Sequence, residues 1–112
     1  MSKYHNRITW IDGIRFDSQM ESDRYLELKL MEKSGDIREL EVHPVFILQP
    51  AFGHNGKIVT VIKYVADFQY KETRTGVRVV EDVKGFETRD FKLKQKLFWF
   101  KYPNLELRLI TK

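Results

Sequence analysis

The sequence contains no cysteine, which excludes disulfide bonds, zinc sites built from thiolates, and catalysis by a cysteine nucleophile. It also lacks an apolar signal segment, a membrane-spanning run, internal repeats and low-complexity tracts. We therefore expect a cytoplasmic protein. With only 112 residues the chain has no room for a second core, so we expect a single domain over residues 1–112.

The composition is that of an ordinary globular protein with a small excess of positive charge. Hydrophobic residues make up 42% of the chain, enough for one modest core. The chain carries 20 Lys and Arg against 16 Asp and Glu, a formal net charge of +4. This excess favours a polyanionic partner such as nucleic acid, although many small basic proteins bind none.

Three ionisable residues, Asp67, Asp82 and Lys84, fall in two segments that the sequence predicts to be the arms of a β-hairpin, residues 59–70 and 77–84. Successive side chains of a strand point to opposite faces, so Asp67 shares a face with Val65 and Gln69, whereas Ala66, Phe68 and Tyr70 lie on the other.

The second arm follows the same rule. One of its faces carries Val80, Asp82 and Lys84, and the opposite face carries Val79, Glu81 and Val83. The turn, residues 71–76, ends in a glycine that can adopt positive φ.

Pairing the two arms places Asp67 opposite residues 80–82, where opposed Cβ atoms lie ~5 Å apart. Two carboxylates so close resist joint ionisation unless a cation lies between them. Mg²⁺ prefers carboxylate and water oxygens, and Lys84 is then placed to orient or deprotonate an attacking water. A solvated Asp–Lys pair on a surface hairpin is the alternative, but the apolar residues of both arms favour buried, central strands.

These residues resemble the signature of the PD-(D/E)XK nuclease superfamily, an acid at the end of one strand followed by acid, any residue and lysine on the next. Asp67 and residues 82–84 match it, with Ala66 in place of the proline, a change that the family tolerates. The predicted order of elements is also similar to the αβββαβ core of that superfamily. Segments 11–13, 16–18, 64–68 and 80–85 are similar to short phage and prophage endonucleases related to archaeal-type Holliday-junction resolvases.

The resemblance implies an α/β fold with a mixed sheet, of the restriction-endonuclease-like type, and a Mg²⁺-dependent DNA endonuclease in which Mn²⁺ substitutes. Asp67 and Asp82 would be metal ligands and Lys84 the residue that activates water, leaving a 5′-phosphate and a 3′-hydroxyl. The expected partners are branched or double-stranded DNA and a second copy of the chain, because symmetric cleavage of a four-way junction requires a homodimer. The setting would be phage DNA recombination or replication in the host cytoplasm.

Two other functions are open at this stage. One is a nucleic-acid-binding module that cleaves nothing, whose expected sign, loss of the lysine or of one acid, is absent. The other is a subunit that nicks DNA only within a larger DNA-processing complex.

The N-terminal part predicts a small β-hairpin, about residues 7–17, reversed at Asp12-Gly13, and then a helix from Gln19 to about Lys33. Glu21 lies on the same stripe of this helix as large apolar residues. Two interpretations are open: Glu21 forms a capping box with Ser18, or it supplies a third carboxylate. The resemblance favours the second, so Glu21 is a candidate catalytic residue and metal ligand, directly or through water.

The rest of the chain predicts strands over residues 45–48 and 58–68, with a loop over residues 52–57 whose Gly53, Asn55 and Gly56 favour a tight reversal. A second helix is predicted from about Thr88 to Lys101, and a final strand over residues 105–110.

The second helix carries basic residues on two sides. Lys94 lies between two apolar arcs, so we expect it to contact the scissile phosphate or the carboxylates, although a helix rotated to solvate Lys94 is the alternative. Lys92, Lys96 and Trp99 lie on the opposite arc. That arc is either a DNA-backbone contact or a solvated face, and Trp99 is also a candidate dimer contact. The candidate DNA-binding residues are Lys92, Lys96, Thr88 and Arg89, with Thr88 equally a helix N-cap.

Overall fold

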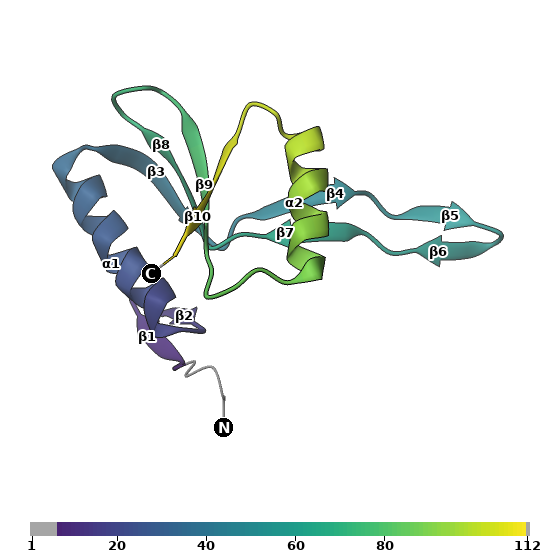
Figure 1. Ribbon diagram of the computed structural model, residues 1–112, viewed down its shortest axis with the longest axis horizontal. Helices are drawn as coiled ribbons and strands as arrows, with labels where there is room; N and C mark the ends of the chain where they lie inside the picture. Colours follow the sequence, from purple (N-terminus) through teal and green to yellow (C-terminus); the bar gives the residue numbers. More distant parts are fainter. Residues whose placement is uncertain (1–6, 112) are drawn as a thin grey trace.

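The computed structural model describes residues 7–111 as two helices around a four-stranded sheet, with three two-stranded ribbons beside them (Figure 1). The sheet has the order β10 (Glu106–Ile110), β9 (Arg78–Val83), β8 (Phe68–Glu72) and β3 (Ile37–Val42). β10 is parallel to β9 and the other pairs are antiparallel. Within residues 7–111, no helix is long and apolar enough to cross a membrane.

The helices, α1 (Gln19–Ser34) and α2 (Arg89–Lys101), complete a chain order of α1, β3, β8, β9, α2 and β10. This matches the expected αβββαβ order only when β4 to β7 are left aside, and its first strand, β3, lies where no strand was predicted. The predicted α/β class with a mixed sheet is confirmed. α2 makes the crossover that a parallel β9–β10 pair requires. The strands β4 to β7 are inserted between β3 and β8.

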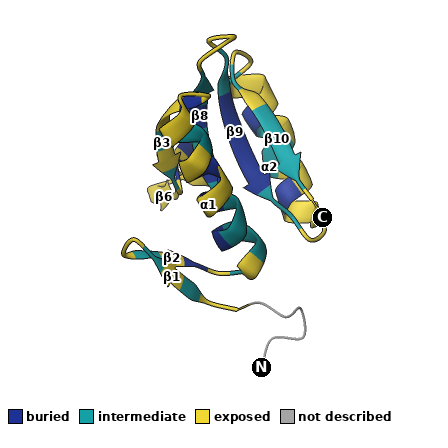
Figure 2. Ribbon diagram, turned by 90° about the vertical axis from the view of Figure 1, so that its left-hand side faces the viewer, coloured by how far each residue is buried: buried dark blue, intermediate teal, exposed yellow. Residues whose placement is uncertain are grey.

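The sheet is buried on both faces because each helix covers one of them. Figure 2 shows α1 in front of the sheet and α2 behind it, with β9 buried between them. Neighbouring residues of β9 accordingly belong to different clusters: Val79 packs on the α1 side and Val80 on the α2 side. β9 is therefore the buried central strand that the sequence predicts for the second arm. The α1-side cluster also contains Phe16, Tyr25, Leu28, Ile37, Phe68 and Tyr70, and the α2-side cluster Phe46, Leu48, Tyr64, Ala66, Phe91 and Phe98.

The predicted N-terminal hairpin is confirmed as β1 (Thr9–Ile11) and β2 (Ile14–Phe16). Asp12 and Gly13 both have positive φ, 54° and 76°, which suits the two-residue turn that joins such strands. The predicted first helix is confirmed as α1, with Ser18 as its N-cap and Gly35 as its C-cap. The second helix and final strand are also confirmed, with Thr88 as N-cap of α2.

The prediction of one continuous first arm, residues 59–70, is wrong. The segment divides into β6 (Lys57–Val59), β7 (Ile62–Val65) and β8, and β7 pairs with β4 (Val45–Gln49) instead of with β9. The reason is the length of β9, which ends at Val83. Beyond that point β7 has only β4 beside it, and a two-stranded ribbon twists more strongly than a full sheet.

This break also changes the predicted faces. Ala66 packs in the α2-side cluster whereas Phe68 packs in the α1-side cluster, so the two residues do not share a face as alternation predicts. Val65 is 48% exposed, and the apolar residues of β7 are less buried than expected. Asp67 lies at the change of face, immediately before β8.

Two further expectations need correction. Residues 52–57 are not a loop alone: they form most of an antiparallel ribbon of β5 (Phe52–His54) and β6, although the tight reversal at Asn55-Gly56 is confirmed. β3 was not predicted, because its alternation is interrupted by a register shift between Arg38 and Glu41, with Glu39 at φ 58°.

Candidate active site

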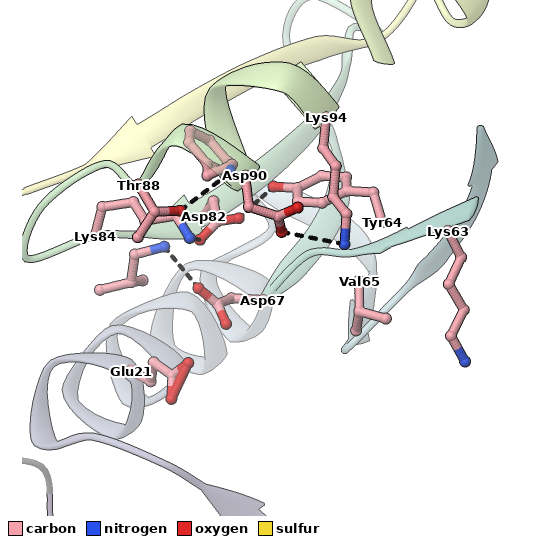
Figure 3. Close-up of a pocket in the computed structure, with 12 residues that line it drawn as sticks. Glu21, Lys63, Tyr64, Val65, Asp67, Asp82, Lys84, Thr88, Asp90 and Lys94 are labelled. Atoms are coloured by element: carbon pink, nitrogen blue, oxygen red, sulfur yellow. Dashed lines mark hydrogen bonds and ion pairs between the residues drawn. The ribbon is translucent and has the colours of Figure 1, made fainter. Parts of the chain in front are cut away.

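A pocket of about 380 Å³ opens where α1, α2 and the ends of β7 and β9 meet. All five residues predicted to be catalytic line this pocket (Figure 3). They come from four separate parts of the fold: one from α1, one from the β7–β8 junction, two from the end of β9 and one from α2. These residues are Glu21, Asp67, Asp82, Lys84 and Lys94.

Asp67 and Asp82 lie opposite each other at the end of the β8–β9 ladder. Phe68 pairs with Glu81, and one step further Asp67 donates its backbone N–H to the carbonyl of Glu81 over 3.1 Å. The Asp67 side chain crosses to β9, where its Oδ2 accepts a hydrogen bond of 2.6 Å from the backbone N–H of Val83. The backbone thus fixes one carboxylate next to the other.

Asp82 is almost fully buried and both of its oxygens have partners. Lys84 Nζ lies 3.3 Å from Oδ1, and the Tyr64 hydroxyl donates a hydrogen bond to Oδ2. Lys84 Nζ also lies 4.2 Å from the centroid of the Phe91 ring, a cation–π contact that helps to hold the ammonium in the pocket. Asp82 and Lys84 therefore share the face that alternation predicts.

Glu81 occupies the opposite face of β9. Its carboxylate accepts two hydrogen bonds from Arg24 of α1, 2.8 Å from Nε and 2.7 Å from Nη2, and one from the Tyr70 hydroxyl. This places Glu81 away from Lys84, as strict alternation predicts.

Glu21 both caps α1 and lines the pocket. Its backbone N–H donates to Ser18 Oγ over 3.2 Å, and its Oε2 accepts from the backbone N–H of Asp17 over 3.0 Å. The second bond departs from a regular capping box, in which the carboxylate would bond to the N-cap residue itself. Glu21 can therefore cap α1 and still present a carboxylate to the pocket.

Lys94 extends from α2 to the pocket wall, with its Nζ 3.5 Å from Asp90 Oδ2 one turn earlier. The arc with Phe91 and Phe98 is buried, whereas Leu93 is 59% and Phe100 89% exposed. Lys94 therefore lies at the border between core and solvent.

The predicted DNA-binding residues are divided by the structure. Thr88 lines the pocket while its Oγ1 caps α2 by accepting from the backbone N–H of Phe91 over 3.0 Å. Arg89, Lys92 and Lys96 are exposed on α2 outside the pocket lining.

Three polar residues of the pocket were not predicted to belong to the site: Lys63, Tyr64 and Asp90. Asp90 had a usable signal, because it lies four residues before Lys94 on a helix. Lys63 and Tyr64 had none, since the twist of the β4–β7 ribbon brings them to the site.

Among residues 7–111, no group of three or more His, Asp or Glu side chains is arranged to hold a metal ion. Asp67 and Asp82 still have the chemistry that suits Mg²⁺, which is commonly held by one or two carboxylates together with water and substrate phosphate.

A family model described as "Protein of unknown function (DUF1064)" matches residues 1–112. The chain belongs to the DUF1064 family. No curated protein matches the chain.

The strongest electrostatic feature of this DUF1064 chain is the state of Asp67. Burial raises the pKa of Asp67 to about 9, with further contributions from the hydrogen bond and charge of Glu21 and from the charge of Asp82. Without a nearby cation the site therefore retains a proton at neutral pH. Burial also raises the pKa of Tyr64, which keeps its hydroxyl protonated as the donor to Asp82.

The pKa of Asp67 predicts how stability of the metal-free protein depends on pH. Between the ordinary Asp value of 3.8 and about 9, the folded state holds a proton that the unfolded chain has lost. The contribution of Asp67 to the free energy of unfolding therefore falls as the pH rises from 3.8 to about 9, and it is constant above that range. Urea unfolding in EDTA between pH 5 and pH 9 should show a smaller decline for Asp67→Asn than for wild type. Equal slopes would contradict the assignment.

Tyr64 is expected to position Asp82. Tyr64→Phe removes the donor to Oδ2 but leaves Lys84 on Oδ1, so we expect the affinity of the two carboxylates for Mg²⁺ or Mn²⁺ to fall by about tenfold, as for other groups that orient a ligand. Isothermal titration of the folded protein with Mn²⁺ measures this change. Tyr102→Phe is the matched control, because that hydroxyl bonds to the carbonyl of Ile47 outside the pocket lining. An equal effect of both variants would mean that Tyr64 acts only through folding.

Proposed function

We propose that this protein is a Mg²⁺-dependent DNA endonuclease that hydrolyses phosphodiester bonds. The observation that carries the proposal is the meeting of Asp67, Asp82 and Lys84 in one pocket at the end of a buried strand. An isolated cluster of this kind is costly to bury, so its presence favours a chemical use. The match to the PD-(D/E)XK signature supports the same activity.

In this proposal Asp67 and Asp82 hold the cation, with Glu21 as an auxiliary acid. The cation supplies Lewis acidity and a more acidic bound water. Lys84, fixed between Asp82 and the Phe91 ring, orients the attacking water and offsets charge that develops on the phosphoryl oxygens. Lys94 lies at the pocket wall, where its ammonium can bind the scissile phosphate in exchange for Asp90.

The proposed substrate is branched or double-stranded DNA, and a Holliday junction is the favoured form. The proposal includes a homodimer, because a four-way junction has two equivalent strands to cut. It also includes a cytoplasmic role in phage DNA recombination or replication.

The deciding assay compares matched linear, nicked, flapped and four-way DNA with the purified full-length protein. Products should carry a 5′-phosphate, and cleavage should require Mg²⁺ or Mn²⁺ and stop in EDTA. Cleavage that persists in EDTA would refute the mechanism. Binding without cleavage under every condition would favour a non-cleaving module, and cleavage only with an added cellular fraction would favour a subunit of a larger complex.

A further inference from the structure

Residues 50–61 form an arm that extends away from the domain. It contains β5 and β6 and continues the β4–β7 ribbon beyond α2 (Figure 1). The radius of gyration is 15.9 Å, whereas a compact domain of this length has about 13 Å. The arm therefore does not bury itself against its own core.

One face of the arm combines apolar and basic side chains. Phe52 pairs with Val59, and two residues further along the ribbon His54 pairs with Lys57. Directly paired residues and those two positions along a strand share a face, so these four side chains lie together. All of them are exposed, with Phe52 at 46%.

The arm and its supporting strands carry no acid. Residues 42–66 contain no Asp or Glu, although the whole chain has 16, whereas Lys57 and Lys63 are both present in this stretch. A surface free of acids and furnished with lysines attracts a polyanion without local repulsion. A second copy is a poorer occupant, because a symmetric contact would bring one basic arm face against another.

A second groove, of about 370 Å³, connects the arm to the candidate active site. The base of the arm lines one side of this groove with Val61, Ile62 and Lys63. α2 lines the other side with Leu93 and Leu97. Lys63, Asp90 and Lys94 line both this groove and the candidate active site, so the two hollows are adjacent. A strand that enters the active site has a continuous path toward the arm.

We propose that the arm binds the DNA backbone on one side of the scissile phosphate. This inference rests on the proposed nuclease function and adds to it a location for the flanking DNA. The seven residues from Gly56 to Ile62 are six strand steps, about 20 Å, which equals roughly six base pairs of duplex. Lys57 is the phosphate contact near the tip, while Phe52 and Val59 pack against sugars and base edges.

The test measures DNA affinity in an Asp82→Asn background, where cleavage does not consume the substrate. Fluorescence anisotropy would use junctions whose arms vary from about 3 to about 10 base pairs, a range that brackets the predicted reach. Affinity should increase until the flank passes about six base pairs. Lys57→Glu should reduce affinity by about tenfold on long flanks, abolish the dependence on flank length, and lower the slope of log affinity against log salt by about one.

Lys33→Glu is the control, since it makes the same charge change on α1, on the other side of the sheet. Equal affinity losses for Lys57→Glu and Lys33→Glu would overturn the arm assignment. So would a Phe52→Ala or Lys57→Glu protein that changes from dimer to monomer by light scattering, because the arm would then bind a second copy. If the wild type cleaves DNA but Lys57→Glu does not change DNA affinity, the arm assignment is wrong and the nuclease proposal stands. If DNA affinity depends on the arm but the wild type does not cleave DNA, the nuclease proposal is wrong and the arm assignment stands.

Discussion

Asp82→Asn is expected to reduce the rate of DNA cleavage by roughly 10²–10³-fold or more, the usual loss when a preorganised charged or polar group is removed from a reacting centre. Asn has nearly the shape of Asp and can still accept a hydrogen bond from Tyr64. It lacks the negative charge that holds a cation and that attracts the ammonium of Lys84 at 3.3 Å. The loss should therefore appear in kcat under single-turnover conditions, with DNA affinity retained.

Lys84→Ala should produce a loss of similar size with a different signature. The two carboxylates remain, so the protein should still bind the cation and DNA, but the group that orients the attacking water is gone. Isothermal titration with Mg²⁺ or Mn²⁺ separates the two variants, because only Asp82→Asn should weaken metal binding.

Asp36→Asn is a suitable control for this series. It makes the same chemical change at an exposed position beyond the end of α1, outside the pocket lining. Urea unfolding of each variant shows whether the fold is retained. Wild-type cleavage rates for Asp82→Asn or Lys84→Ala would eliminate the proposed mechanism, whatever DNA is used.

The face assignments on β9 show why this part of the site could be predicted from sequence. Strand alternation is a local rule, and β9 follows it without a break because neighbours cover it on both faces. Asp82 and Lys84 therefore lie together, and Glu81 lies opposite them. The caps of both helices were also local signals, since Ser18 and Thr88 each bond to a backbone N–H three residues later.

The features that escaped prediction depend on tertiary contacts. The first arm divides where β9 ends, at Val83. Residues 59–70 carry no local signal for the length of β9, because β9 lies later in the chain. The same break brings Tyr64 to Asp82 from a different sheet. β3 was missed because a register shift interrupts the only pattern that would reveal it.

Arg24→Ala is expected to destabilise the fold by about 3 kcal/mol, at the low end of the range for removal of one partner of a buried ion pair. Glu81 has no solvent exposure and receives two hydrogen bonds from Arg24, so the variant leaves a buried carboxylate that still accepts a hydrogen bond from the Tyr70 hydroxyl but has lost its charged partner. Arg24 is itself 20% exposed, which lets water replace part of the lost contact. Urea unfolding should show a lower midpoint with an unchanged slope.

The double variant Arg24→Met with Glu81→Leu shows how much of the loss in stability comes from leaving the Glu81 carboxylate unpaired and how much comes from losing the ion pair itself. Removing both partners eliminates the buried carboxylate, so apolar replacements of similar volume recover the stability that the unpaired charge costs, less the hydrogen bond that the Tyr70 hydroxyl loses. We expect the double variant to be more stable than Arg24→Ala. Glu81 and Asp82 are adjacent on β9 but face opposite helices, so the double variant should also retain DNA cleavage at temperatures where it is folded. A double variant that is folded but inactive would show that the Arg24–Glu81 pair acts on the site through β9, beyond its part in holding α1 to the sheet.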